Sequence, residues 1–259
     1  MLFNRRSLLA AIAALGLGPA MAQDDAPVIA AASSLQFALT EVAAAFTVET
    51  GQKLRLSFGS TGNISRQIRE GAPFEMFLAA DDTTTAALHA EGLTRDAGMI
   101  YAAGRIVLVA PNGSALDVDQ GLDGVRAVLD RGHLTRFAIA NPDHAPFGIA
   151  AREALMARGL WDDLQPVLVL GENVSQAAAF ALSGNAEGGI IAYSLALAPE
   201  VAPRGRHALI PADWHAPLRQ RMVLLKDAGA VAEAFYTYMT QPAARAIMER
   251  YGFTLPEGE

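Results

Sequence analysis

Cysteine is absent from this chain, and its absence excludes several classes of protein. A chain without cysteine forms no disulfide bonds, so its stability must come from its hydrophobic core. It also offers no cysteine for lipid attachment at an export signal. The five histidines include no two at the spacing of a metal site, so a metalloenzyme is not expected and no metal ligand is predicted.

Basic residues are also scarce relative to acidic ones. Lys and Arg number 20 against 27 Asp and Glu, a net charge of −7. Residues 1–22 contain Arg5 and Arg6 and no acidic residue, so the rest of the chain carries −9. A chain this acidic is not expected to bind nucleic acid or anionic membranes. It can bind an anion only where the local site is built from neutral donors.

The apolar run at the N-terminus is too short for an ordinary membrane span. Arg5 and Arg6 precede an apolar stretch at 7–19, and Ala20-Met21-Ala22 is a small-residue cleavage motif before Gln23. This order predicts a cleavable signal peptide at 1–22 and a periplasmic protein; the alternative is a single N-terminal anchor. The Arg-Arg-Ser-Leu-Leu order resembles a twin-arginine signal, although ordinary export signals also carry paired arginines.

Short apolar stretches alternate with segments of helical spacing along the remaining chain. The predicted strands are 28–32, 53–58, 76–79, 105–110, 137–140, 167–170, 189–192 and 220–225. The predicted helices end before Gly51 and Gly71 and near Glu91, span 149–158 and 174–182, and close the chain at 230–239 and 243–251. This alternation predicts an α/β protein with mixed, mostly parallel sheets.

Two connecting regions are rich in loop-forming residues, at 111–124 and 197–205. Neither is long or polar enough to be a free linker between independent domains. We therefore expect two lobes that exchange strands, with lobe one formed by 23–104 and 213–259 and lobe two by 105–212.

Four of the predicted strands end in small or hydroxyl-bearing residues and then enter a helix. The four turns are Ala32-Ser33-Ser34, Gly59-Ser60-Thr61-Gly62, Ala145-Pro146-Phe147-Gly148 and Glu172-Asn173-Val174-Ser175. Ligands of open α/β sheets lie beyond the carboxyl ends of the strands, where helix N-termini present free N–H groups. Serine after a strand is also a common helix N-cap, so each turn has a purely structural interpretation. Together the turns predict an oxyanion site that contains only donors.

Longer segments resemble a known family. They are AASSLQFALTEVA, SFGSTGNISRQIREGAPFEMFLAAD, IANPDHAPFGIAAREAL, ENVSQAAAFALSGNAEGGIIAYS and FYTYMTQPAARAIMERYGF. In this order they resemble the periplasmic molybdate-binding proteins of ABC transporters. The resemblance implies the type II periplasmic binding fold, with two α/β lobes joined by crossover strands. It also implies capture of molybdate or tungstate between the lobes, without a cofactor, by a monomer that delivers the anion to a membrane permease.

The resemblance further implies which residues bind the oxyanion. Ser33, Ser34 and Ser60 are implied as hydroxyl donors. Phe147 and Val174 occupy positions at which the family supplies backbone N–H groups.

A tyrosine donor is common in the family after the apolar strand at 189–192. Here Ala192 holds that place and Tyr193 stands one residue later, which on a strand places a side chain on the opposite face. Tyr193 is therefore a weaker candidate, as are Thr61 and Asn173.

Three rival functions are considered. An exported serine hydrolase would use Ser33 or Ser60 with a histidine, but no Gly-x-Ser-x-Gly motif surrounds Ser60. His144, the histidine closest to a predicted turn, is expected to be a surface residue. A ferric-ion binder would need Tyr, His or carboxylate ligands at the turns, which do not offer such a set. A sulfate binder would require the same donors as a molybdate binder, so sulfate stays open.

Overall fold

The fold was analysed in a computed structural model of the chain, which describes residues 26–256. The predicted signal peptide and its cleavage site lie outside the described residues. The strands are β1 (Val28–Ala32), β2 (Arg55–Gly59), β3 (Phe74–Leu78), β4 (Met99–Gly104), β5 (Ile106–Pro111), β6 (Phe137–Ala140), β7 (Leu168–Gly171), β8 (Gly188–Ala192), β9 (Gly205–Leu209) and β10 (Leu218–Leu224). The α-helices are α1 (Gln36–Thr50), α2 (Thr61–Arg69), α3 (Thr83–Ala90), α4 (Asp123–Asp130), α5 (Pro146–Ala157), α6 (Trp161–Leu164), α7 (Val174–Ala181), α8 (Tyr193–Ala196), α9 (Ala230–Tyr238) and α10 (Pro242–Arg250), and a short 3₁₀ helix, η1 (Ser33–Leu35), joins β1 to α1.

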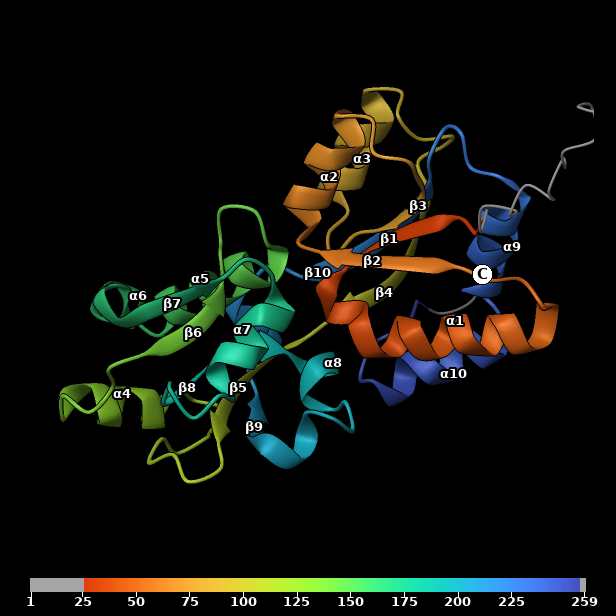
Figure 1. Cartoon of the computed structure of the whole chain (residues 1–259). Coiled ribbons are helices and arrows are strands. Elements are labelled where there is room, and N and C mark those ends of the chain that lie inside the picture. The colour runs from red at the N-terminus through yellow and green to blue at the C-terminus, as the bar shows by residue number, and fades with distance from the viewer. Residues whose placement is uncertain (1–25, 257–259) are drawn as a thin grey trace, which may run out of the picture.

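The strands form two sheets with the same internal plan. The order is β2-β1-β3-β10-β4 in one sheet and β7-β6-β8-β5-β9 in the other. In each sheet, the second strand, β1 or β6, has parallel neighbours on both sides. The fourth strand, β10 or β5, is antiparallel to both of its neighbours. The two sheets and their helices lie side by side as two lobes (Figure 1). This confirms the expected α/β architecture of a type II periplasmic binding protein.

The sheets are mixed, as predicted, but parallel pairs are not in the majority. Within residues 26–256, each sheet contains two parallel and two antiparallel pairings. The antiparallel pairings of the first sheet involve β10 and β4, and those of the second involve β5 and β9. These strands flank the chain's passages between lobes, where no crossover helix returns the chain in the parallel direction.

Adjacent strands carry the chain from one lobe to the other. Only Arg105 separates β4 from β5, and residues 210–217 connect β9 to β10. We therefore keep the lobe limits predicted from the sequence, 23–104 with 213–259 and 105–212, as a proposal supported by this sheet membership.

Strands β4 and β9 were not predicted from the sequence. Both lie at the edge of a sheet, and every residue of β9 is partly buried or exposed. An edge strand such as β9 need not have the continuous apolar run of a strand that is buried on both faces. Strand β4 does have such a run, Met-Ile-Tyr-Ala-Ala-Gly, and sequence reasoning missed it. The central strands β1, β5, β6 and β8, by contrast, are almost wholly buried and were found within a residue of their predicted limits.

Helices cover the faces of both sheets. Helix α1 packs beside α10 (Figure 1). Phe46 of α1 contacts the rings of Phe235 and Tyr238 in α9 edge-on. None of the helices within residues 26–256 is long and apolar enough to cross a membrane. The cores hold both sheets rigid and so fix the positions of the turns at the strand ends.

Candidate functional site

The four turns predicted from the sequence meet between the lobes. Turns after β1 and β2 belong to lobe one, and those preceding α5 and α7 belong to lobe two. They surround a cavity whose empty volume is at most about 180 Å³. Pockets for drug-sized ligands are typically about 300–1,000 Å³, so this cavity is too small for such a ligand. Its lining consists of Ala32, Ser33, Ser34, Gly59, Ser60, Thr61, Ala80, Ala145, Pro146, Phe147 and Val174.

Ser33 and Ser34 come from η1, directly after β1. Both are buried, with 3% and 1% of their surface exposed. The Ser33 hydroxyl oxygen accepts a hydrogen bond from the N–H of Ser175, 3.3 Å away in lobe two. The hydroxyl oxygen of Ser34 is buried without a hydrogen-bond partner in the described chain. Neither side chain caps the helix that follows, so the purely structural explanation does not apply to these two serines.

Ser60 and Thr61 stand at the start of α2. The Ser60 hydroxyl accepts from the N–H of Asn63 at 3.4 Å, a long capping bond, and the Thr61 hydroxyl accepts from the N–H of Ala80 at 2.9 Å. A hydroxyl has one proton and two lone pairs, so accepting from a backbone N–H leaves its own proton to donate. The backbone therefore prepares these hydroxyls to act as donors.

Two backbone N–H groups of lobe two complete the lining. Helix α5 starts at Pro146, three residues earlier than predicted, which places Phe147 in its first turn; Val174 is the first residue of α7. Neither N–H forms a hydrogen bond within residues 26–256. Both helices direct the positive ends of their dipoles into the cavity. The phenylalanine and valine side chains serve packing, since only their backbones are needed as donors.

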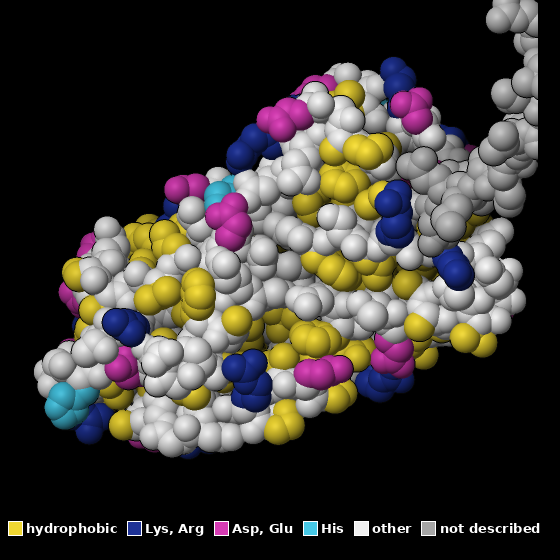
Figure 2. Space-filling model, in the orientation of Figure 1, with side chains coloured by type: hydrophobic (Ala, Val, Ile, Leu, Met, Phe, Trp, Pro, Cys, Tyr) yellow, Lys and Arg dark blue, Asp and Glu magenta, His cyan; other side chains and the backbone are white. Residues whose placement is uncertain are grey.

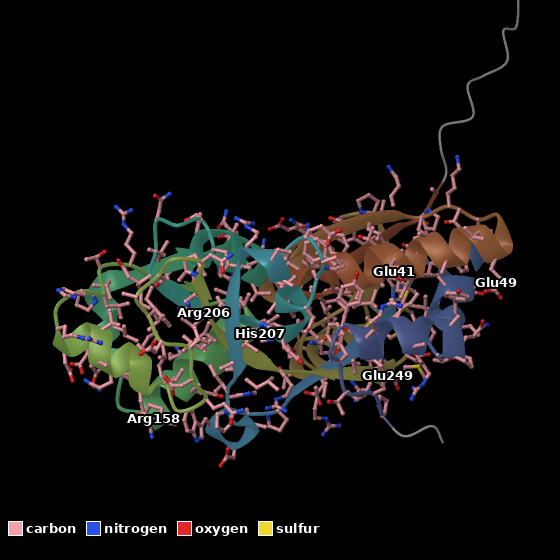
Figure 3. The ribbon with its side chains drawn as sticks, turned by 90° about the horizontal axis from the view of Figure 1, so that it is seen from below. Glu41, Glu49, Arg158, Arg206, His207 and Glu249 are labelled. Atoms are coloured by element: carbon pink, nitrogen blue, oxygen red, sulfur yellow. The ribbon has the colours of Figure 1, made fainter. Side chains whose placement is uncertain are left out.

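No charged side chain lines the cavity. Charged residues such as Glu49, Glu249 and Arg206 lie exposed on the outer surfaces of the lobes (Figure 3). On the face in Figure 2, residues of either sign are scattered rather than gathered into one patch. Among residues 26–256 there is no group of three or more His, Cys, Asp or Glu side chains that could hold a metal ion. The site therefore consists of neutral dipoles.

Gly62 allows the lobes to approach closely beside this cavity. Its N–H donates to the carbonyl oxygen of His144 at 2.9 Å. A β-carbon at Gly62 would lie 2.7 Å from the same oxygen and 2.9 Å from the His144 side chain. Sequence reasoning assigned Gly62 to a turn but missed this contact, because residues so far apart in sequence are brought together only by folding.

The structure places His144 in a turn, as expected, but largely buries its side chain instead of leaving it on the surface. It lies in the turn before α5, but only 16% of its side chain is exposed, and its Nδ1 lies 3.0 Å from the Ser60 hydroxyl oxygen. The turn therefore directs the ring across the interface into lobe one. Its position two residues before Pro146 was the available signal, but only the packing of the lobes reveals its partner.

Asn173 and Tyr193, two of the weaker candidates, do not line the cavity. The Asn173 side chain caps α7 by accepting from the N–H groups of Ser175 and Gln176. Tyr193 begins α8, and its ring packs against His207, with 5.7 Å between ring centroids, and against Gly252. Thr61, the third weaker candidate, does line the cavity.

Tyr193→Phe is expected to leave anion affinity within about twofold of the unchanged protein. The substitution removes only the phenol oxygen, and the ring packs away from the cavity. Isothermal titration calorimetry of both proteins checks this. A loss of tenfold or more would show that the tyrosine reaches the ligand, contrary to its position in this structure.

Comparisons with known proteins show the family of this chain. The family model for bacterial extracellular solute-binding proteins matches residues 27–254. The molybdate-binding protein ModA of Azotobacter vinelandii is 37% identical, over 98% of this chain and 100% of the relative. ModA of Rhodobacter capsulatus is 36% identical, over 93% of each chain.

A solved structure agrees as well. The periplasmic molybdate-binding protein of Azotobacter vinelandii superposes with a TM-score of 0.81 at 30% identity, covering 89% of this chain and 100% of that one. The chain therefore belongs to the bacterial extracellular solute-binding protein family, in the group that includes the ModA molybdate-binding proteins.

Proposed function

We propose that this protein captures molybdate or tungstate in the cavity between its lobes and delivers the anion to the permease of an ABC transporter. The proposed ligands are the hydroxyls of Ser33, Ser34 and Ser60 and the N–H groups of Phe147 and Val174. The protein acts as a periplasmic monomer, without a cofactor or catalytic step.

The observation that carries this proposal is the chemistry of the cavity lining. Its polar side chains are hydroxyls, and hydroxyls that accept from backbone N–H groups keep a proton to donate. A fully ionised tetraoxyanion brings no proton and needs donors only. The donors come from both lobes, so one ligand can contact both and stabilise the closed arrangement.

Molybdate and tungstate are expected to bind tightly, and phosphate much more weakly near neutral pH. Phosphate carries at least one proton at that pH, and the lining has no carboxylate to accept a hydrogen bond from it. Calorimetric titration of the mature protein with each anion, before and after treatment with a metal chelator, tests this. Equal affinity for phosphate and molybdate would contradict the proposed function, and so would loss of binding on chelation.

Sulfate is the alternative ligand. The sulfate-binding protein SubI of Mycobacterium tuberculosis has a TM-score of 0.72 at 15% identity, so the fold alone accommodates either anion. Molybdate and sulfate both accept hydrogen bonds from the same kinds of donor, and they differ in size. The sulfate titration decides between them: tighter binding of sulfate than molybdate would reassign the ligand and retain the site.

The contact between Ser60 and His144 also invites comparison with a serine hydrolase. The nearest carboxylate oxygen, on Glu172, lies 3.8 Å from Nε2 of the histidine, beyond hydrogen-bond length. The serine faces a cavity of at most about 180 Å³, which leaves little room for an acyl substrate. The relatives above carry the names of binding proteins, and the proposed function includes no catalysis.

The mature protein is expected to begin at Gln23. Arg5 and Arg6, the apolar stretch and the small-residue motif at 20–22 together form an export and cleavage signal. Intact mass and N-terminal sequencing of protein from the periplasm test this expectation. Recovery of membrane-bound protein with residues 1–22 intact would contradict it. Replacing both arginines with lysine would distinguish twin-arginine export, which should stop, from general export.

A further inference from the structure

His144 reaches across the interface between the lobes to a proposed ligand of the anion. The residue belongs to lobe two, and its Nδ1 lies 3.0 Å from the hydroxyl oxygen of Ser60 in lobe one. Its carbonyl oxygen accepts from the N–H of Gly62 at 2.9 Å. The backbone hydrogen bond holds the His144 turn against the start of α2. Because both contacts join the two lobes, the ring can face the serine only while the lobes are together.

We propose that His144 is a positioning residue for Ser60: its Nδ1–H donates to the serine oxygen and turns the serine proton toward the bound oxyanion. This inference rests on the proposed function, because it assigns a role to a side chain that does not itself line the cavity. It adds an interaction that links lobe closure to the orientation of one donor.

The count of protons and lone pairs around Ser60 favours this direction. The hydroxyl oxygen already receives the Asn63 N–H at 3.4 Å. If the hydroxyl then donated to the ring, its proton would be used there, and a tetraoxyanion in the cavity would face an oxygen without a proton. If Nδ1–H donates instead, both lone pairs are occupied and the proton remains for the anion. The imidazole can carry its proton on either nitrogen, so a neutral ring can make this bond.

No other side chain of residues 26–256 forms a hydrogen bond with the ring. Glu172 lies 3.8 Å from Nε2, beyond hydrogen-bond length, and its other carboxylate oxygen accepts from the Asn63 side chain across the interface. Asn63 and Glu172 therefore hold the lobes together beside the ring, while Ser60 is the ring's hydrogen-bonding partner.

The test is a double-mutant cycle with molybdate as the probe. Calorimetry on the mature protein would compare the unchanged chain with His144→Leu, His144→Asn, Ser60→Ala and the double variant Ser60→Ala/His144→Leu. His144→Leu should weaken binding about three- to tenfold, the worth of one hydrogen bond. His144→Asn places an amide N–H near the position of Nδ1 and should restore affinity to within about twofold. In the Ser60→Ala background, His144→Leu should have almost no effect.

The control is His133→Leu, which makes the same change at an exposed histidine of lobe two and should leave affinity unchanged. Equal losses from His144→Leu with and without Ser60 would overturn the proposal, because the ring would then act on closure alone. No loss in His144→Leu, or no rescue in His144→Asn, would also overturn it. If the unchanged protein failed to bind molybdate, that result would contradict the proposed function itself. The two hypotheses can therefore fail separately. Melting temperatures confirm that all variants are folded.

Discussion

Replacing Ser60 with alanine is expected to weaken molybdate binding by about ten- to a hundredfold. The serine is 4% exposed and faces the cavity, and a hydrogen bond to a charged group contributes about 1.5–3 kcal/mol. Each 1.4 kcal/mol corresponds to about tenfold in affinity. Ser33→Ala should cause a similar loss. Titration calorimetry measures the affinity, and thermal melting of the same samples measures stability.

The two roles of Ser60 separate in this experiment. If the serine served only as the cap of α2, its replacement would cost about 1 kcal/mol of stability and leave the affinity of the folded protein unchanged. Val174→Ala is the matched control, because it shortens a side chain at the cavity and keeps the N–H donor. It should cost much less affinity than either serine change. Unchanged affinity in both serine variants would refute the site assignment.

Gly62→Ala is expected to weaken binding by about fivefold to a hundredfold without lowering the melting temperature of the ligand-free protein. The added methyl would lie 2.7 Å from the His144 carbonyl oxygen across the interface. Overpacking of this kind costs about 1–3 kcal/mol, and here the cost falls only on the closed arrangement. Within α2 itself, alanine is a better helix former than glycine, so lobe one should stay folded.

A methyl added elsewhere provides the control for this prediction. Gly229→Ala introduces the same group at an exposed position on lobe one, where the nearest atom is a carboxylate oxygen of Glu75 at 3.2 Å, in the same lobe. Its affinity for molybdate should equal that of the unchanged protein. Small-angle scattering of Gly62→Ala with saturating molybdate should show a more open particle than the unchanged protein. Equal affinity and equal dimensions in Gly62→Ala would show that the close contact of Gly62 with His144 is not needed for binding.

A buried polar pair joins two neighbouring strands beside the passage between lobes. The Tyr101 hydroxyl on β4 lies 2.8 Å from the amide oxygen of Gln220 on β10 and donates to it. Burial, and to a smaller extent the negative charge of Asp81, raises the pKa of this phenol well above its ordinary value. Tyr101 therefore stays protonated and can donate throughout the neutral range, so this link should not respond to pH there.

Local sequence patterns were sufficient for the central strands and for the four turns that contribute to the site. Buried strands such as β1 and β6 have uninterrupted apolar sequences, and chain connectivity places a turn directly after each. The five proposed ligand residues, Ser33, Ser34, Ser60, Phe147 and Val174, were implied by the family resemblance, and all of them line one cavity. Edge strand β9 lacks such a pattern, because all of its residues are partly buried or exposed. Strand β4 is an apolar run that sequence reasoning missed.

The sequence by itself determined the class of the fold, the neutral character of the site and the turns that build it, because these depend on residue type and on neighbours along the chain. Only the tertiary structure decided which groups meet between the lobes. His144 and Gly62 illustrate the difference: their contacts join residues 82 or more positions apart, in different lobes. The geometry of such contacts depends on how the two lobes pack against each other, and a local sequence pattern does not predict it.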